Sequence, residues 1–372
     1  MAENSAVREA LFLLLRRALG RLRPADEAFA GLPAAAWQAL YRLAAAQGVL
    51  GIAWDGLRLL EEAGGLPADG APPRELRIGW SFNTAQDERR YARQRRTIGR
   101  LAAFYAQHGI RTMLLKGYGL SLCYPVPEHR PCGDIDIWLY GRQQEADALL
   151  RREKGIAIDE EKHLHTVFRI DGVMVENHYD FLNVHAHPSN RQLERMLRTY
   201  AAQPGEEIDV EGATVVLPSA DFNALFLLRH AAAHFAAAEI GVRHLLDWML
   251  FAERYSDRTD WEQLERTARE MNMHRFLHCM NALATDLLGM EAACVPPVPR
   301  DPALERRVLD DILAPRFGEI PPKIGLLRGL IFRTRRWWAN RWKHRIVYRE
   351  GLLRTFFVQL RSHLLKPASL RH

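Results

Sequence analysis

Two acidic residues one position apart carry the strongest chemical signal in this chain of 372 residues. Asp134 and Asp136 alternate with apolar residues, and this alternation predicts a strand with both carboxylates on one face. Two like charges on one strand face oppose folding unless a cation lies between them. A third acid, Glu176, lies in a later short apolar run. Three carboxylates on neighbouring strands suit a hard ion such as Mg²⁺, which also recruits phosphates, whereas a solvated edge strand is the competing interpretation.

Residues before the paired acids extend the candidate site towards a phosphate ligand. The apolar segment 111–115 predicts a strand that runs into Lys116 and Gly117. A lysine beside a glycine, where the backbone can approach closely, is suited to holding phosphate as a point charge, although Lys116 could also simply end a strand in water. Arg130 precedes the acids in a Pro-rich loop. It could bind a phosphate, pair with Asp134 or form a purely structural ion pair.

Several histidines could have a functional role or could simply be packed in the core. His178 follows Glu176 by two residues, so a regular strand places both on one face, where His178 would support the site. His163 and His165 precede this strand pair and could contact a substrate. His230 and His234 lie at a spacing compatible with a metal on a helix, but no third ligand is evident near them in the sequence. We therefore favour a packed or hydrogen-bonded pair over zinc.

A later helix carries a charged pair at a spacing of four residues. Arg243 and Asp247 could form an ion pair on the helix, or could close a nucleotide cleft from the helical side.

The order of predicted elements indicates a small α/β or α+β core between helical regions. Segments 166–170 and 173–176 read as a hairpin around Asp171-Gly172, which is a strong turn signal. Other predictions are a long helix over 74–107, a helix over 142–152, a helix cap at Ser219, and two helices in 221–255 that are interrupted near Gly241.

The net charge of +6 is unevenly distributed along the chain. Residues 321–372 contain thirteen Lys or Arg residues and one acid, whereas the preceding residues carry a net negative charge. The basic segment also contains tryptophans, as in Trp337, Trp338 and Trp342. Three interpretations fit: packing on the helical domain, contact with an anionic membrane, or contact with nucleic acid such as RNA.

Other features of the sequence bound the class of protein. No apolar run approaches the length of a transmembrane helix, and the N-terminus lacks the pattern of a secretory signal. The four cysteines show neither metal-binding nor disulfide-framework spacing. These observations predict a reduced, cytoplasmic setting.

With these segments in order, the chain resembles the uncharacterised nucleotidyltransferase family of the polymerase-β-like superfamily. The Lys-Gly turn followed by the Asp-x-Asp strand is its most specific part. The matching residues are Leu114 to Gly119, Tyr124-Pro125, Arg130 to Leu139, Val175 to Tyr179, Leu228 to His230 and Gly241 to Trp248. Better-known members of the superfamily place Gly-Ser or Gly-Gly in the turn that contacts the triphosphate, whereas Lys116-Gly117 stands there in this chain.

The resemblance implies a metal-binding Asp pair and a third carboxylate on a later strand. We therefore expect an α+β fold with a nucleotidyltransferase-like mixed sheet core flanked by N- and C-terminal helical regions. The predicted parts are an N-terminal helical region (1–108), a catalytic core (109–217), a helical domain (218–295) and a basic, Trp-rich helical tail (296–372).

The expected site residues follow from the same comparison. Asp134, Asp136 and Glu176 are expected to bind metal and act in catalysis, with Lys116, Gly117 and Arg130 binding the nucleotide. The expected activity is the transfer of NMP from an NTP, with ATP as the first candidate and Mg²⁺ or Mn²⁺ as cofactor. The acceptor, whether a protein, a small molecule or a nucleic acid, stays open. A phosphotransferase and a non-catalytic nucleotide- or nucleic-acid-binding protein are the alternatives.

Overall fold

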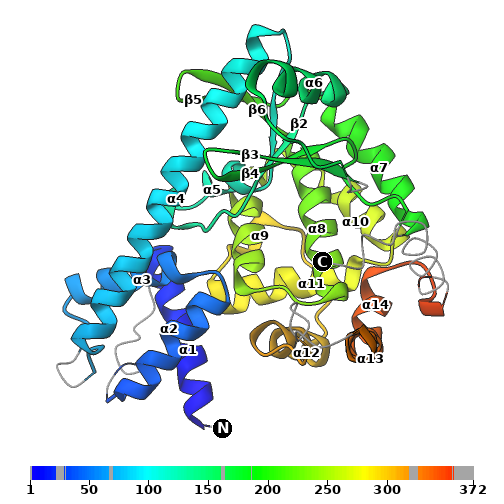
Figure 1. The fold of residues 1–372 in the computed structure, drawn as a ribbon. Helices are drawn as coiled ribbons and strands as arrows, with labels where there is room; N and C mark the ends of the chain where they lie inside the picture. The colour runs from blue at the N-terminus through cyan, green and yellow to red at the C-terminus, as the bar shows by residue number, and fades with distance from the viewer. Residues whose placement is uncertain are drawn as a thin grey trace.

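A computed structural model describes residues 2–21, 29, 31–66, 70–160, 164–185, 187–317, 326–353 and 355. It contains a six-stranded sheet flanked by helices, which confirms the predicted α+β class (Figure 1). In chain order the strands are β1 (Met113–Leu115), β2 (Ile135–Trp138), β3 (His165–Ile170), β4 (Val173–His178), β5 (Glu206–Val210) and β6 (Ala213–Leu217).

The sheet is mixed, with the strand order β3-β4-β2-β1-β6-β5. Strand β2 runs antiparallel to β1 and parallel to β4, so the two strands that carry the acidic motifs are direct neighbours. Strand β1 pairs in parallel with β6, and β5 pairs antiparallel with β6. All six strands fall inside the range 109–217 proposed for the core, while the domain boundaries themselves stay predictions.

The predicted hairpin is confirmed as β3 and β4. Its turn residues Asp171 and Gly172 have φ angles of 52° and 78°, as a type I′ turn requires at both central positions. Antiparallel pairing extends from Ile170↔Val173 to His165↔His178, so the hairpin is slightly longer than the sequence indicated. The hairpin of β5 and β6 was not predicted as such.

The two faces of the sheet meet different helices, because side chains alternate along each strand. One face carries Ile135, Ile137 and Val175 and packs in one core with α4 (Arg74–Gln107) and α6 (Gln143–Lys154). The other face carries Trp138 and packs with α8 (Ala220–Ala237), as in Figure 1, where β3 and β4 lie between α6 and α8. Asp136 alternates with Ile135 and Ile137 along β2, and Glu176 follows Val175 on β4, so both acids belong to the face of the sheet that packs with α8.

The N-terminal helices form a bundle to one side of the sheet (Figure 1). They are α1 (Ala2–Ala18), α2 (Ala34–Ala46) and α3 (Leu50–Glu62), joined to the sheet by the long helix α4. Helices α1 and α3 pack very closely at Gly56, where a Cβ atom would lie 2.0 Å from the carbonyl oxygen of Leu14. The predicted long helix over 74–107 is confirmed with the same bounds.

The second helical region follows β6. It comprises α9 (Val242–Tyr255), α10 (Trp261–Glu270), α11 (His274–Leu283), η3 (Ala284–Leu288), η4 (Ala292–Cys294) and α12 (Pro302–Leu313), with α7 (Pro188–Ala201) packed against α8. Ser219 caps α8 by accepting a hydrogen bond from the Phe222 N–H at 3.3 Å, as predicted. The expected break near Gly241 is also present, and a Cβ there would lie 2.9 Å from the Gln47 carbonyl oxygen.

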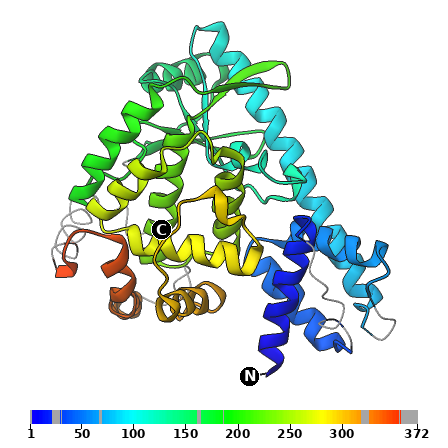
Figure 2. The ribbon, with the colours of Figure 1, turned by 180° about the vertical axis from the view of Figure 1, so that it is seen from behind.

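The two helical regions contact each other below the sheet as it is drawn in Figures 1 and 2. Figure 2 shows α11 running across the back of the molecule towards α1, and α1 contacts η3. The Arg16 Nε donates to the Leu287 carbonyl at 2.7 Å, which ties the first helix to the later helices. Over the described residues, no helix is both long and apolar enough to cross a membrane.

The basic tail is partly packed. It contains α13 (Leu326–Ala339) and α14 (Arg341–Val347), while 318–325 and 356–372 lie outside the described residues. The rings of Trp342 and Phe235 pack edge to face, with 5.5 Å between their centroids. Lys343 is buried and forms an ion pair with Asp311 at 2.5 Å. The packing interpretation is therefore confirmed for α14, whereas Trp338 is 57% exposed.

Candidate active site

The pairing of β2 with β4 brings the three predicted acids together. Asp136 stands directly opposite Glu176 in this parallel pair, and Asp134 immediately precedes β2. One carboxylate oxygen from each of the three residues lies within 4.8 Å of the others. Asp136 is buried at 4% exposure, whereas Asp134 is half-buried. The arrangement concentrates three carboxylates at one point of the sheet.

The surroundings of the three acids shift their pKa values in different directions. Burial, assisted by the charge of Asp136, raises the pKa of Asp134. Burial would also raise the pKa of Asp136, but Lys116 and His178 outweigh it and hold this pKa below its usual value. For Glu176 the opposing effect of burial is outweighed by His165 and His178, which lower its pKa well below the usual range. Asp136 and Glu176 therefore stay charged near neutral pH.

Lys116 is the cation that the paired acids require. Its Nζ lies 3.0 Å from Asp136 Oδ1 and 5.6 Å from the ring centre of Phe226 on α8. Burial alone would lower the pKa of Lys116, but the three acids raise it. The backbone of Lys116 has φ 49° and ψ −134°, and Gly117 follows with φ 28° at the start of α5 (Gly117–Ser121). The turn thus directs the amine at the carboxylates.

Arg130 forms a structural ion pair, but not with Asp134. Its Nε and Nη2 bind the two oxygens of Asp247 at 2.7 and 2.9 Å, and Tyr124 donates to the same carboxylate at 2.8 Å. Arg130 follows η2 (Pro127–His129) and is 5% exposed, so this bidentate pair ties the loop before β2 to α9. Its role towards a nucleotide stays a prediction.

The suggested helix pair of Arg243 with Asp247 is replaced by other contacts. The carboxylate of Asp247 is engaged by Arg130 and Tyr124, as described above, while Arg243 donates to the Pro131 carbonyl at 3.2 Å. This carbonyl belongs to the loop that precedes the paired acids, so Arg243 also links α9 to that loop.

Two histidines flank the acids on the same face of the sheet. His178 Nε2 lies 2.9 Å from Asp136 Oδ1 and 3.6 Å from Glu176 Oε2, which confirms that His178 shares the face of Glu176. His165, opposite His178 in the hairpin, has its Nε2 3.2 Å from Glu176 Oε1. His163 lies outside the described residues.

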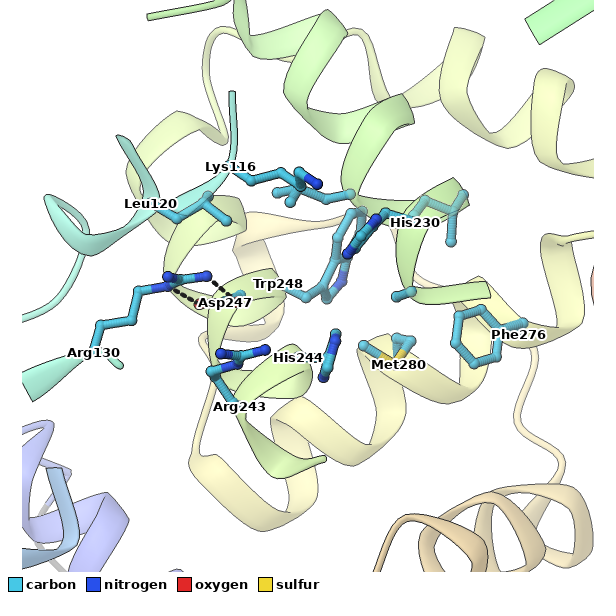
Figure 3. A pocket seen from close by; sticks show the side chains of 13 residues that line it. Lys116, Leu120, Arg130, His230, Arg243, His244, Asp247, Trp248, Phe276 and Met280 are labelled. Carbon is cyan, nitrogen blue, oxygen red and sulfur yellow. Dashed lines mark hydrogen bonds and ion pairs between the residues drawn. The ribbon is translucent and has the colours of Figure 1, made fainter. Parts of the chain in front are cut away.

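A pocket lies beside Lys116, the residue that it shares with the acidic cluster. It encloses about 490 Å³, including the part open to solvent. Figure 3 shows Lys116 on one wall, the paired Arg130 and Asp247 on another, and Trp248, Phe276 and Met280 facing the same space. Arg243 and His244 complete the α9 side. Cations thus reach the pocket from both sides, Lys116 from the end of β1 and Arg243 from α9, and apolar side chains come from α9 and α11.

The histidines of this pocket are neutral. Burial, with nearby cations, lowers the pKa of His230 well below its usual value and that of His244 to about 3. The His230 and His234 rings lie 4.5 Å apart between centroids, with His244 6.4 Å from His230. The His230 and His234 rings thus lie in contact on one face of α8, and the interpretation as a packed pair without zinc stays a prediction.

Sequence reasoning missed several residues of the pocket. His244 and Trp248 lie in the quoted stretch Gly241 to Trp248 but received no role, although their place in that stretch was a usable signal. Phe276 and Met280 come from α11, and nothing in their apolar helical pattern distinguishes a pocket wall from a core.

The donor set at the acids fits a hard divalent cation. Asp134, Asp136 and Glu176 offer carboxylate oxygens close enough to share one ion. Such oxygens are the ligands that Mg²⁺ and Mn²⁺ prefer. The amine of Lys116 now offsets part of their charge, and a phosphate group that reached the site could take up that amine.

Comparison with known proteins gives the family. The family model described as "Uncharacterised nucleotidyltransferase" matches residues 33–289, which is more than half of the chain. The chain belongs to this family. The nucleotidyltransferase match includes the whole sheet and every residue that lines the pocket, and it ends after η3, so α12 to α14 lie beyond it.

Other comparisons add little to this assignment. A solved structure, described as an antigenic nucleotidyltransferase-like protein from Paracoccidioides brasiliensis, is 12% identical over 53% of this chain and 92% of that chain. Its TM-score is 0.34, so this likeness carries no argument here. No curated protein gives a significant match.

Proposed function

We propose that this protein is a metal-dependent nucleotidyltransferase that transfers NMP from an NTP to an acceptor and releases pyrophosphate. The observation that carries the proposal is the convergence of Asp134, Asp136 and Glu176 beside Lys116, at the edge of a pocket that holds further cations. Membership of the nucleotidyltransferase family supports the same reaction class. ATP is the first candidate for the donor.

Each group has a distinct part in the proposal. The three acids hold Mg²⁺ or Mn²⁺, which supplies positive charge for the phosphates in the transition state. Lys116 exchanges Asp136 for a phosphate oxygen, and Gly117 leaves room for the backbone to approach the phosphates. Arg130 contributes from the pocket wall, where its pair with Asp247 fixes its guanidinium.

The reaction is a single displacement at phosphorus. An acceptor oxygen forms a bond to the α-phosphorus, and the bond from this phosphorus to the oxygen that bridges to the β-phosphate breaks. The leaving electrons go to pyrophosphate, and the acceptor proton goes to a carboxylate of the cluster or to solvent. Arg243 lies across the pocket from Lys116 and would draw a phosphate into it.

The test combines ligand binding with product analysis. Thermal unfolding is measured with each NTP, with and without Mg²⁺, for the wild type and for the Asp134→Ala/Asp136→Ala double variant. A ligand that binds only the folded state raises the midpoint by mass action. We expect a Mg²⁺-dependent rise in the wild type that the double variant loses. Asp171→Asn, in the turn between β3 and β4, is the control and should keep the rise.

Product analysis distinguishes the reaction classes. Radiolabelled NTP is incubated with candidate acceptors drawn from proteins, small molecules and nucleic acids. Pyrophosphate and an acceptor that carries NMP support the proposal, whereas release of ADP from ATP would assign a phosphotransferase. Binding without turnover by any acceptor class would assign a non-catalytic nucleotide-binding protein.

The cellular setting and the role of the tail belong to the same proposal. The four cysteines are free, which supports a reduced, cytoplasmic setting. The exposed Trp338 and basic residues of α13 are candidates for contact with an anionic membrane or RNA. Sedimentation with anionic liposomes and chromatography on immobilised RNA in rising salt would separate these two partners.

A further inference from the structure

A second group of ligand-type side chains lies beside the three acids. His165 on β3 and His178 on β4 are cross-strand partners, and Glu176 lies two residues before His178 on the same face. One donor atom from each of these residues lies within 4.8 Å of the others, and all three are buried. The proposed transfer reaction uses Glu176 but gives neither imidazole a part.

The hydrogen bonds of His178 leave one ring nitrogen facing acids. Its Nδ1 lies 3.2 Å from the Asp180 carbonyl oxygen, which can only accept, so Nδ1 carries the proton of the neutral ring. In this neutral ring the lone pair of Nε2 would point at Asp136 Oδ1 and Glu176 Oε2, at 2.9 and 3.6 Å, whereas a protonated ring would donate to them from Nε2. A lone pair facing two carboxylates is unfavourable unless a proton or a metal ion lies between them. A backbone carbonyl on the other nitrogen is also the usual way to orient a metal-binding histidine.

His165 supplies an independent sign of a missing partner. His165 is 8% exposed, and within the part of the chain that the structure describes neither of its ring nitrogens has a hydrogen bond. The Nε2 approaches Glu176 Oε1 at 3.2 Å, which is an ion-pair distance, but the ring is not aligned for a hydrogen bond. Buried imidazoles normally find a partner, so a ring that is aimed at a carboxylate without bonding to it points to an absent ligand.

We propose that His165, Glu176 and His178 hold a divalent transition-metal ion of the Zn²⁺ class, next to the all-carboxylate site and sharing Glu176 with it. Two imidazole nitrogens and one carboxylate oxygen suit zinc-like ions, whereas Mg²⁺ prefers oxygen alone. Three protein ligands leave a fourth position for water or a substrate oxygen. The two sites would therefore differ in the metal that they select.

This assignment does not depend on nucleotidyl transfer. A metal can bind the three residues in the absence of any nucleotide. The metal site and the nucleotidyl transfer can therefore be disproved independently of each other. The competing interpretation is that His178 is a protonated imidazolium that only balances the charge of the acids. In that case His165 and His178 would bind no metal.

The experiment uses Co²⁺ as a spectroscopic substitute for Zn²⁺. Full-length protein without a histidine tag is treated with chelator, and Co²⁺ is added while the visible d–d absorption is recorded. We expect one equivalent to produce a band typical of nitrogen ligands, which Zn²⁺ displaces and excess Mg²⁺ does not. His165→Asn and His178→Gln should each weaken Co²⁺ binding at least tenfold.

Matched variants distinguish this site from its neighbour. Asp134→Asn should keep the Co²⁺ band but lose the Mg²⁺-dependent nucleotide effect. His278→Gln is the control, because His278 is also buried beside a glutamate, with Nε2 3.1 Å from both Glu265 oxygens, and belongs to neither metal group. Unchanged Co²⁺ affinity in the folded His165 and His178 variants would overturn the proposal.

A second measurement keeps the test decisive if the histidine variants do not fold. X-ray absorption of wild-type protein loaded with one equivalent of Zn²⁺ should show scattering from two imidazole rings. Coordination by oxygen alone, or no retained Zn²⁺ after dialysis, would contradict the assignment.

Discussion

Lys116 has a backbone conformation that residues other than glycine rarely adopt. Its φ of 49° and ψ of −134° lie outside the regions favoured by residues with a Cβ atom. Such conformations cost on the order of 1–3 kcal/mol, and they persist where the surrounding structure imposes them. Here the turn between β1 and α5 places the amine 3.0 Å from Asp136, so the strain and the ion pair arise at one residue.

Replacing Lys116 by glycine and by alanine separates these two contributions. Both variants lose the amine, and both should lose the nucleotide-dependent rise in unfolding temperature. Lys116→Gly should be more stable than Lys116→Ala by about 1 kcal/mol, because glycine adopts a positive φ without strain. Unfolding in urea measures the difference. Equal stability, or a more stable alanine variant, would show that the turn is unstrained.

Helix α7 contains a titratable group that links it to the end of the sheet. Glu194 accepts hydrogen bonds from the backbone N–H groups of Phe181 and Leu182, both at 3.0 Å, and lies near Arg198. Burial raises the pKa of Glu194 to about 7, despite these favourable contacts. The folded state therefore binds this proton more tightly than the unfolded state, whose glutamate titrates near its usual value.

The raised pKa predicts the sign of a pH effect on stability. The stabilisation from protonated Glu194 is complete below the unfolded pKa and is lost as pH rises through about 7. Between pH 5 and pH 8 the wild type should lose up to about 3 kcal/mol relative to Glu194→Gln, which keeps an acceptor and does not titrate. Urea unfolding at several pH values measures this difference. A constant difference across the range would contradict it.

The elements near the acids were more predictable than the contacts between them. The Asp-Gly turn and the alternation around Asp136 specify local structure, so the strands β2, β3 and β4 could be anticipated. Strand β5 is rich in acids at the sheet edge and lacks a strong apolar pattern, which is why it was missed. The pair of Arg130 with Asp247 joins residues 117 positions apart, and no local pattern encodes such a contact.

At the scale of the whole molecule, α14 is attached to the other helices by a buried lysine. Lys343 is 1% exposed, pairs with Asp311 of α12 and donates to the Ala238 carbonyl at 3.0 Å beyond the end of α8. One side chain therefore connects three separate helices. The match to the family model ends before α12, so this connection is an addition outside the matched region.

Removing this charge tests how much the tail contributes to stability. Lys343→Met leaves Asp311 buried without its partner and should lower the free energy of unfolding by about 3 kcal/mol. Adding Asp311→Asn should recover part of the loss, because no unpaired charge remains. Arg345→Ala, an exposed position on the same helix, is the control and should change stability by less than about 0.5 kcal/mol. An equal effect of both single variants would exclude a specific role for Lys343.

The Arg130–Asp247 pair has a kinetic consequence for ligand entry. It forms one wall of the pocket, where it joins the loop before β2 to α9, and leaving one partner of such a buried pair without the other costs about 3–5 kcal/mol. If opening this wall costs a similar amount, a molecule with the wall open is populated at less than about 1%. A ligand too large for the closed opening must wait for this rare state, and its association rate falls by the same factor. The ion pair would thus act as a size-dependent filter that sets how fast the pocket is filled.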